Sequence, residues 1–113
     1  MTPRITARPD SVMVRTTTVL TGTGFRPRRK LTVYECGARL WIAPQDVCTH
    51  GNVVTVRTSR HGRFRIPLQV LVCPLKSKTP ARFERTCYIG VSAIDGIGVV
   101  KLSAATRITV TGP

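Results

Sequence analysis

The amino-acid sequence predicts an all-β protein, a β-sandwich of seven short strands that forms a single domain over residues 1–113. Three observations predict it. Segments in which apolar and polar residues alternate recur between turns rich in glycine and proline, and no segment has the period of an amphipathic helix. Aromatic residues make up only 5% of the chain, so valine, isoleucine, leucine and threonine, which favour strands, must fill the interior. A hydrophobic content of 42% in 113 residues suits one folded core.

The first three strands are expected within residues 4–36. Residues 4–14 predict an edge strand, a turn at Pro9 and a returning segment, because proline lacks the N–H that a central strand needs. Residues 16–22 are rich in β-branched side chains and lead into the glycine turn TGTGF. Leu31–Cys36 alternates again and gives the third strand.

The rest of the chain repeats the same pattern of strand and turn. The expected elements are a long loop over 37–52, a strand over 52–58, a hairpin turn over 59–62, a strand over 63–72, a loop over 73–86, a strand over 87–94, a turn at 95–96 and a strand over 99–110. The inward faces of these strands give the expected core, which comprises Val33, Phe64, Ile66, Leu68, Val91 and Leu102.

The charge balance points to an anionic partner. Eighteen lysine and arginine residues against five acidic ones give a formal net charge of +13. Such a balance suits nucleic acid, an acidic envelope polymer, a lipid headgroup or an acidic protein, and a solubilising surface without any partner is the alternative.

The order of the strands predicts where these cations gather. Consecutive antiparallel strands alternate in direction, so every second loop should lie at the same end of a sandwich. One end should therefore collect Arg26, Arg28, Arg29, Lys30, Arg60 and Arg63. Arginine favours bidentate contacts to phosphate or carboxylate. Because no aromatic residues are interleaved, contact with DNA would involve its backbone and would not depend on sequence.

Four cysteines in a short β-rich chain predict two disulfides. Each of two loops is flanked by a pair, so we expect Cys36–Cys48 and Cys73–Cys87. Zinc is the alternative, but Cys48-Thr-His50 lacks the paired C-x-x-C spacing of structural zinc sites. Disulfides indicate an oxidising compartment, so a secreted or cell-envelope location is expected.

The N-terminal segment shows no signal peptide. Met1 is followed by polar residues without an apolar stretch. The sequence is therefore either a mature segment with an added methionine or a protein exported by another route. No run of apolar residues reaches the length of a membrane span. We expect the protein to be a monomer.

The inventory of side chains argues against an enzyme. His50 and His61 fall in a loop and a turn, and neither belongs to an arrangement with a serine or cysteine nucleophile. The five carboxylates are scattered without a pairing pattern, and TGTGF lacks the spacing of a phosphate-binding loop. The sequence therefore predicts no catalytic residues and no metal site.

Several segments together resemble the neocarzinostatin family of actinobacterial enediyne apoproteins. They are ITARP, the TGTGF turn, LTVYEC before a cysteine-closed loop, GRFRIPLQV after a glycine hairpin, and CYIGVSAIDG, in this order over nearly the whole chain. The resemblance implies an immunoglobulin-like seven-stranded sandwich with two disulfides and no enzymatic activity. It also implies a cleft beside the sandwich that holds a small apolar chromophore without a covalent bond.

The resemblance implies a set of lining residues for that cleft, namely Leu40, Trp41, Ile42, Tyr88, Gly90 and Ser92. Glu35 is expected to be an anchor beside the cleft or the ion partner of an arginine, and Trp41 as a core residue is the alternative to Trp41 as a cleft wall. The chain departs from the founding members in its charge of +13 and in Tyr88, where the prototype has glutamine. The expected function is a carrier of a small apolar ligand, and the alternative is an arginine-rich module that binds a polyanion or a partner protein.

Overall fold

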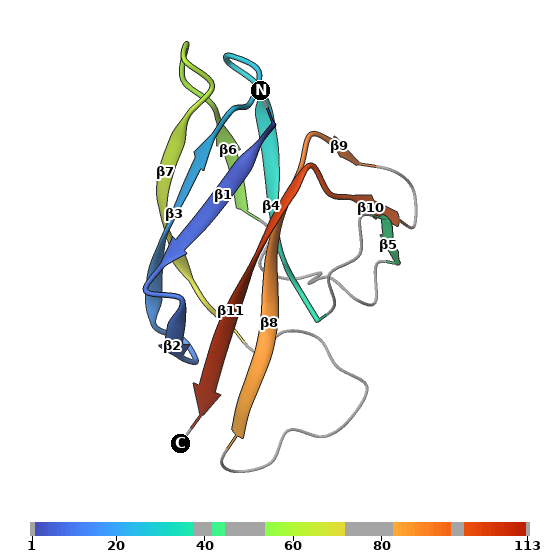
Figure 1. Ribbon diagram of the computed structural model, residues 1–113. Helices are drawn as coiled ribbons and strands as arrows, with labels where there is room; N and C mark the ends of the chain where they lie inside the picture. The colour runs from blue at the N-terminus through green and yellow to red at the C-terminus, as the bar shows by residue number, and fades with distance from the viewer. Residues whose placement is uncertain (1, 38–41, 45–53, 72–82, 96–98, 113) are drawn as a thin grey trace.

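The computed structural model describes residues 2–37, 42–44, 54–71, 83–95 and 99–112. Within these ranges, eight strands form two facing sheets and three shorter strands form a third sheet beside them (Figure 1). No described residue is helical. The described part of the chain therefore contains no helix that could cross a membrane. The predicted all-β sandwich is confirmed, whereas the predicted count of seven strands is wrong.

The smaller of the facing sheets has three antiparallel strands in the order β1-β3-β7. They are β1 (Arg4–Arg8), β3 (Thr17–Thr23) and β7 (Phe64–Gln69). In β1 the apolar Ile5 and Ala7 are buried and the residues between them are exposed, as a strand with one face on the core requires.

The larger sheet has five strands in the order β2-β11-β8-β4-β6. They are β2 (Ser11–Met13), β11 (Ala104–Gly112), β8 (Phe83–Ser92), β4 (Lys30–Cys36) and β6 (Val54–Arg57). The pair β2–β11 is parallel and the other pairs are antiparallel.

The expected return within residues 4–14 is wrong, because the chain changes sheet at Pro9. β1 pairs with β3, while β2 pairs with β11 in the other sheet. Pro9 has no N–H with which to continue the first ladder. Its carbonyl accepts from Thr18 Oγ1 at 2.7 Å, and the Asp10 carbonyl accepts from the Thr109 N–H at 2.8 Å. The connection is therefore bonded to both sheets.

The turn over 59–62 is present, but it does not join a hairpin. The Gly62 N–H donates to the Ser59 carbonyl at 2.9 Å, as expected of a tight turn. The strands on either side, β6 and β7, pair with β4 and β3 and so belong to different sheets. The turn residues make the chain reverse its direction. Which sheet the chain enters after the turn depends on the strand with which β7 pairs, and that strand is β3.

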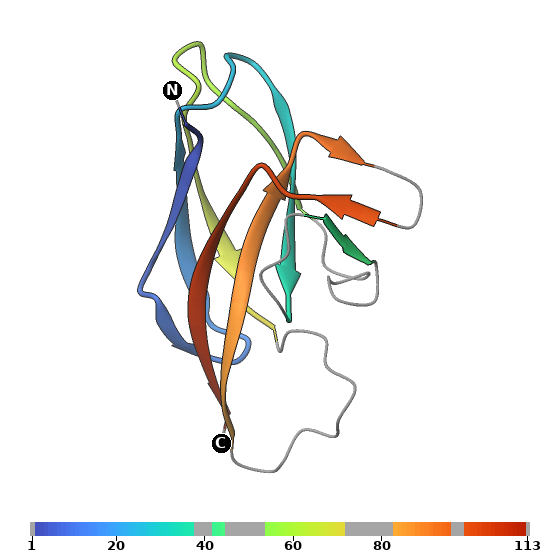
Figure 2. The same ribbon diagram turned by 45° about the vertical axis from the view of Figure 1, so that its right-hand side comes forward.

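Two predicted boundaries also change. Residues 83–86, expected in a loop, belong to β8, because they pair with β11 from Phe83 opposite Gly112 to Thr86 opposite Thr109. The expected strand over 99–110 divides into β10 (Val99–Lys101) and β11. β10 joins β5 (Ile42–Pro44) and β9 (Ile94–Asp95) in the third sheet, ordered β5-β10-β9, which lies outside the five-stranded sheet (Figure 2).

The core fills the space between the two facing sheets. Leu20 and Leu68 come from the three-stranded sheet, and Leu31, Val33 and Ile89 from the five-stranded one. The expected core residues Phe64, Leu68, Val33 and Val91 are buried there, and Ile66 is half-buried against them. Leu102 is buried too, but in a separate cluster on the outer side of the five-stranded sheet.

Candidate functional site

The outer face of the five-stranded sheet carries a second set of apolar side chains. Residues that lie directly opposite in an antiparallel pair project from the same face. Tyr34 lies opposite Gly90, which lies opposite Ala105, and this gives one row across three strands. In the neighbouring row, Cys36 lies opposite Tyr88, which lies opposite Arg107.

These side chains pack around Leu102, which follows β10. Leu102 is 5% exposed and Cys36 is fully buried, and the half-buried Tyr34, Tyr88 and Ala105 surround them. Gly90 forms the floor under Leu102, because a Cβ there would lie 2.6 Å from Leu102 Cδ2. We call this surface the tyrosine face and define it as Tyr34, Cys36, Tyr88, Gly90, Leu102 and Ala105.

The tyrosine face includes two of the residues that were predicted to line a cleft. Tyr88 and Gly90 belong to it, and Ser92 lies two residues further along the same side of β8, opposite Thr32. Ile42 opens β5, where its backbone lies opposite Lys101 of β10. Leu40 and Trp41 lie outside the described residues.

Sequence reasoning missed four residues of this region: Tyr34, Leu102, Ala105 and Arg107. Alternation along 31–36 already placed Tyr34 on the face opposite Val33, and that signal could have identified it. Leu102 was expected in the main core, because it was assigned to an unbroken strand. Ala105 and Arg107 join Tyr88 and Gly90 only through the register between β8 and β11, for which the sequence has no local signal.

Glu35 lies on the other side of β4, with Leu31 and Val33, and faces the three-stranded sheet. Its side chain is 8% exposed. Its Oε2 accepts a hydrogen bond at 3.0 Å from the N–H of Leu71, which lies just beyond the end of β7. Burial raises the pKa of this carboxyl to about 7, and the hydrogen bond from Leu71 offsets part of that effect. The Glu35 carboxyl therefore links the two sheets and does not project from the tyrosine face.

The cysteines lie partly outside the described residues. Cys36 and Cys87 are fully buried, and each is disulfide-bonded. Cys48 and Cys73 are not among the described residues, so the pairing Cys36–Cys48 and Cys73–Cys87 stays a prediction. Within the described part of the chain, no three histidine, cysteine or acidic side chains come close enough to hold a metal ion.

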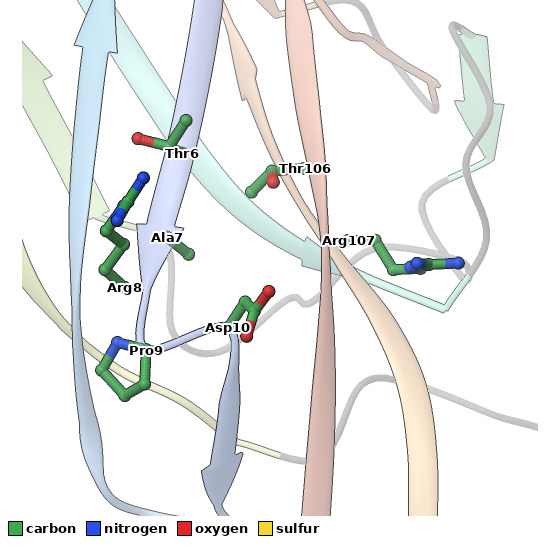
Figure 3. Close-up of a pocket in the computed structure, with 7 residues that line it drawn as sticks. All are labelled: Thr6, Ala7, Arg8, Pro9, Asp10, Thr106 and Arg107. Carbon is green, nitrogen blue, oxygen red and sulfur yellow. The ribbon is translucent and has the colours of Figure 1, made fainter.

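A polar pocket of about 540 Å³ lies elsewhere, between β1 and β11 (Figure 3). Its lining comprises Thr6, Ala7, Arg8, Pro9, Asp10, Thr106 and Arg107. In Figure 3 the Asp10 carboxylate points between the two strands, whereas the Arg107 side chain points away past β11. The pocket results from the change of sheet at Pro9, since β2 covers only residues 109–111 of β11. It is open and polar, and so it does not suit an apolar ligand.

The predicted cationic residues lie in two loops at one end of the sandwich. Arg26, Arg28 and Arg29 precede β4, and Arg60 and Arg63 precede β7. Lys30 begins β4 and lies opposite Arg57 of β6. Figure 1 shows both loops beside the N-terminus, far from the C-terminus.

The two facing sheets form a neocarzinostatin-like β-sandwich, and comparison with solved structures carries this assignment. Among solved structures, macromomycin is similar over 94% of this chain and 96% of its own, with a TM-score of 0.62 and 17% sequence identity. No protein-family model matches the sequence, and no curated protein does. At this level of identity the likeness shows a shared fold.

Proposed function

We propose that this protein is a non-enzymatic carrier, exported to the cell envelope or beyond it, that holds a small, flat, apolar ligand without a covalent bond. The ligand would lie against the tyrosine face, between it and the third sheet. The observation that carries the proposal is the apolar cluster around Leu102, which lies outside the main core and includes both tyrosines of the chain.

The chemistry of this surface supports such a ligand. Apolar ligand sites combine hydrophobic and aromatic walls with a few polar groups that fix orientation. The half-buried rings of Tyr34 and Tyr88 offer flat apolar surface, and the exposed Arg107 stands next to Tyr88 at the edge. The neocarzinostatin-like fold and the resemblance of the sequence both support a carrier over an enzyme.

The proposal keeps most of the residues that the sequence predicts. Tyr88, Gly90 and Ser92 would supply the sheet side of the site, and Leu40, Trp41 and Ile42 stay predicted lining residues. Glu35 faces the space between the two sheets, so the proposal assigns its carboxyl to the bond with Leu71 instead of to the ligand.

The first test is the absorbance spectrum of the protein purified from its natural source. A carried chromophore should add absorbance at wavelengths beyond the tryptophan band. A second test titrates the protein with flat aromatic and polyene compounds and follows the fluorescence of Trp41, the single tryptophan.

The matched variants are Tyr88→Ala and Met13→Ala. Met13 is 56% exposed on β2 and lies opposite Thr111, so its truncation removes an apolar side chain that does not belong to the tyrosine face. Tyr88→Ala should weaken binding by a factor of about 2–10, because an aromatic contact contributes about 0.5–1.5 kcal/mol. Met13→Ala should bind as the unchanged protein does. Equal affinity in both variants, with the fold intact, would overturn the assignment to the tyrosine face.

A further inference from the structure

The loops at the N-terminal end of the sandwich form a cationic surface and are joined by hydrogen bonds. Thr58 is only 3% exposed, and its Oγ1 accepts from the Arg29 N–H at 2.7 Å and donates to the Arg26 carbonyl at 2.6 Å. Its own N–H donates to the Arg29 carbonyl at 2.9 Å. One buried threonine therefore holds the loop before β4 against the loop before β7.

Further contacts fix the same two loops. The Phe25 N–H donates to the Gly62 carbonyl at 3.2 Å, and the Arg28 N–H donates to the Ser59 carbonyl at 3.1 Å. Gly62 has a φ of 71°, and a Cβ there would lie 2.0 Å from the Phe25 carbonyl oxygen. The close approach of the loops thus requires glycine at position 62.

This end gathers eight cationic residues, which we call the arginine pole: Arg4, Arg26, Arg28, Arg29, Lys30, Arg57, Arg60 and Arg63. Arg29 is half-buried and the others are exposed. Arg4 was not expected here, and it joins the pole because it lies opposite Thr23, where β3 leads into the first loop.

No acidic residue lies along the segments that build the pole. Residues 2–9, 17–34 and 54–71 contain neither aspartate nor glutamate. Among the carboxylates whose side chains are described, Asp10 lies at the change of sheet, Glu35 near the end of β4, and Glu84 near the start of β8. Like charges held at fixed positions repel one another, and an anion with closely spaced charges would relieve that repulsion.

We propose that the arginine pole binds the sugar–phosphate backbone of double-stranded nucleic acid without reading its sequence. Seven of the eight cations are arginine, whose paired N–H groups match the oxygens of a phosphate. The two loops offer no helix or ribbon that would enter a groove and read base edges.

The aromatic residues near the pole favour a duplex over a single strand. Phe25 and Phe64 are 9% and 7% exposed, and their ring centroids lie 5.7 Å apart in the core. Their faces are therefore not available for stacking on unpaired bases, on which single-strand binding relies. This inference is independent of the tyrosine face.

Fluorescence anisotropy of a labelled short DNA duplex, measured from about 50 to about 200 mM salt, tests the proposal. If six pole cations contact phosphates, the affinity should fall about 10³-fold over this range. The double variant Arg60/Arg63→Gln removes two exposed charges. It should lower the slope of log affinity against log salt by about 1.8, since each phosphate contact contributes about 0.9.

The matched control is Arg8/Arg15→Gln, which removes the same charge from exposed residues toward the other end of β1 and β3. It should retain the slope of the unchanged protein, and circular dichroism should show both variants folded. An unchanged slope in Arg60/Arg63→Gln, or an equal drop in the control, would overturn the proposal. Competition by sodium polyglutamate as strong as by unlabelled duplex would show that the pole accepts carboxylate polymers generally, and would overturn the assignment to nucleic acid.

Discussion

At the scale of single residues, Glu35 shows how burial changes a side chain's chemistry. A carboxyl in water ionises near pH 4.5, whereas the pKa of Glu35 is raised to about 7 between the sheets. The folded protein therefore holds this proton more tightly than the unfolded chain does. Between pH 4.5 and about 7 the unfolded state has released the proton and the folded state has kept it.

Stability should accordingly be highest below this window and should fall as the pH rises through it. A shift of this size corresponds to roughly 3 kcal/mol. We expect Glu35→Gln, which keeps an acceptor for the Leu71 N–H, to lose this dependence on pH. Denaturant unfolding of both proteins at several pH values measures it. If the unfolding free energies of the unchanged protein and of Glu35→Gln differ by the same amount at every pH between 4.5 and 7, then Glu35 does not titrate with a raised pKa.

Leu68 is a second residue whose role can be measured. It is 6% exposed in the main core, on the face of β7 that the sequence pattern predicts. Leu68→Ala should lower the free energy of unfolding by about 2–5 kcal/mol, because truncation leaves a cavity. Arg65→Ala, on the exposed face of the same strand, should change it by less than about 0.5 kcal/mol. Equal effects of the two changes would contradict the assignment of the faces.

At the scale of elements, the faces of β4 and β8 favour the predicted pairing of each cysteine across its own loop. Cys36 and Cys87 lie in neighbouring strands, yet Cys36 packs on the outer face and Cys87 belongs to the main core. Side chains on opposite faces of a sheet are poorly placed to bond to each other. Each of these two cysteines is disulfide-bonded, and a partner across its adjoining loop fits this geometry.

We therefore expect peptide mapping under non-reducing conditions to find Cys36 with Cys48 and Cys73 with Cys87. Reduction should cost about 3 kcal/mol for each bond, because loops of this length regain freedom in the unfolded chain. A fragment that joins Cys36 to Cys87, or unreacted thiols, would refute the pairing.

At the scale of the whole molecule, the two proposed binding surfaces occupy different parts of one sandwich. The tyrosine face lies on the outer side of β4, β8 and β11, and the arginine pole lies at one end of the sandwich, where two loops cross between the sheets. Both loops of the pole are such crossings, from β3 to β4 and from β6 to β7. Because all crossings at one end of a sandwich lie close together, residues about 30 positions apart in sequence become neighbours.

The sequence by itself determined the all-β class, most strand positions and most of the core. These features follow from local alternation, as in Phe64, Arg65 and Leu68, which needs no knowledge of distant residues. It also placed the cations in two loops at one end, because strand direction alternates along the chain.

Only the tertiary structure decided which strands pair. The sheet change at Pro9, the separation of β6 from β7 and the division of the last strand at Leu102 depend on partners far away in sequence. The same long-range pairing brings Tyr34, Tyr88 and Leu102 to one face, and it sets the Leu71 N–H against the Glu35 carboxyl. Alternation assigns a side chain to one of two faces, but the hydrogen-bonded neighbour determines what that face meets.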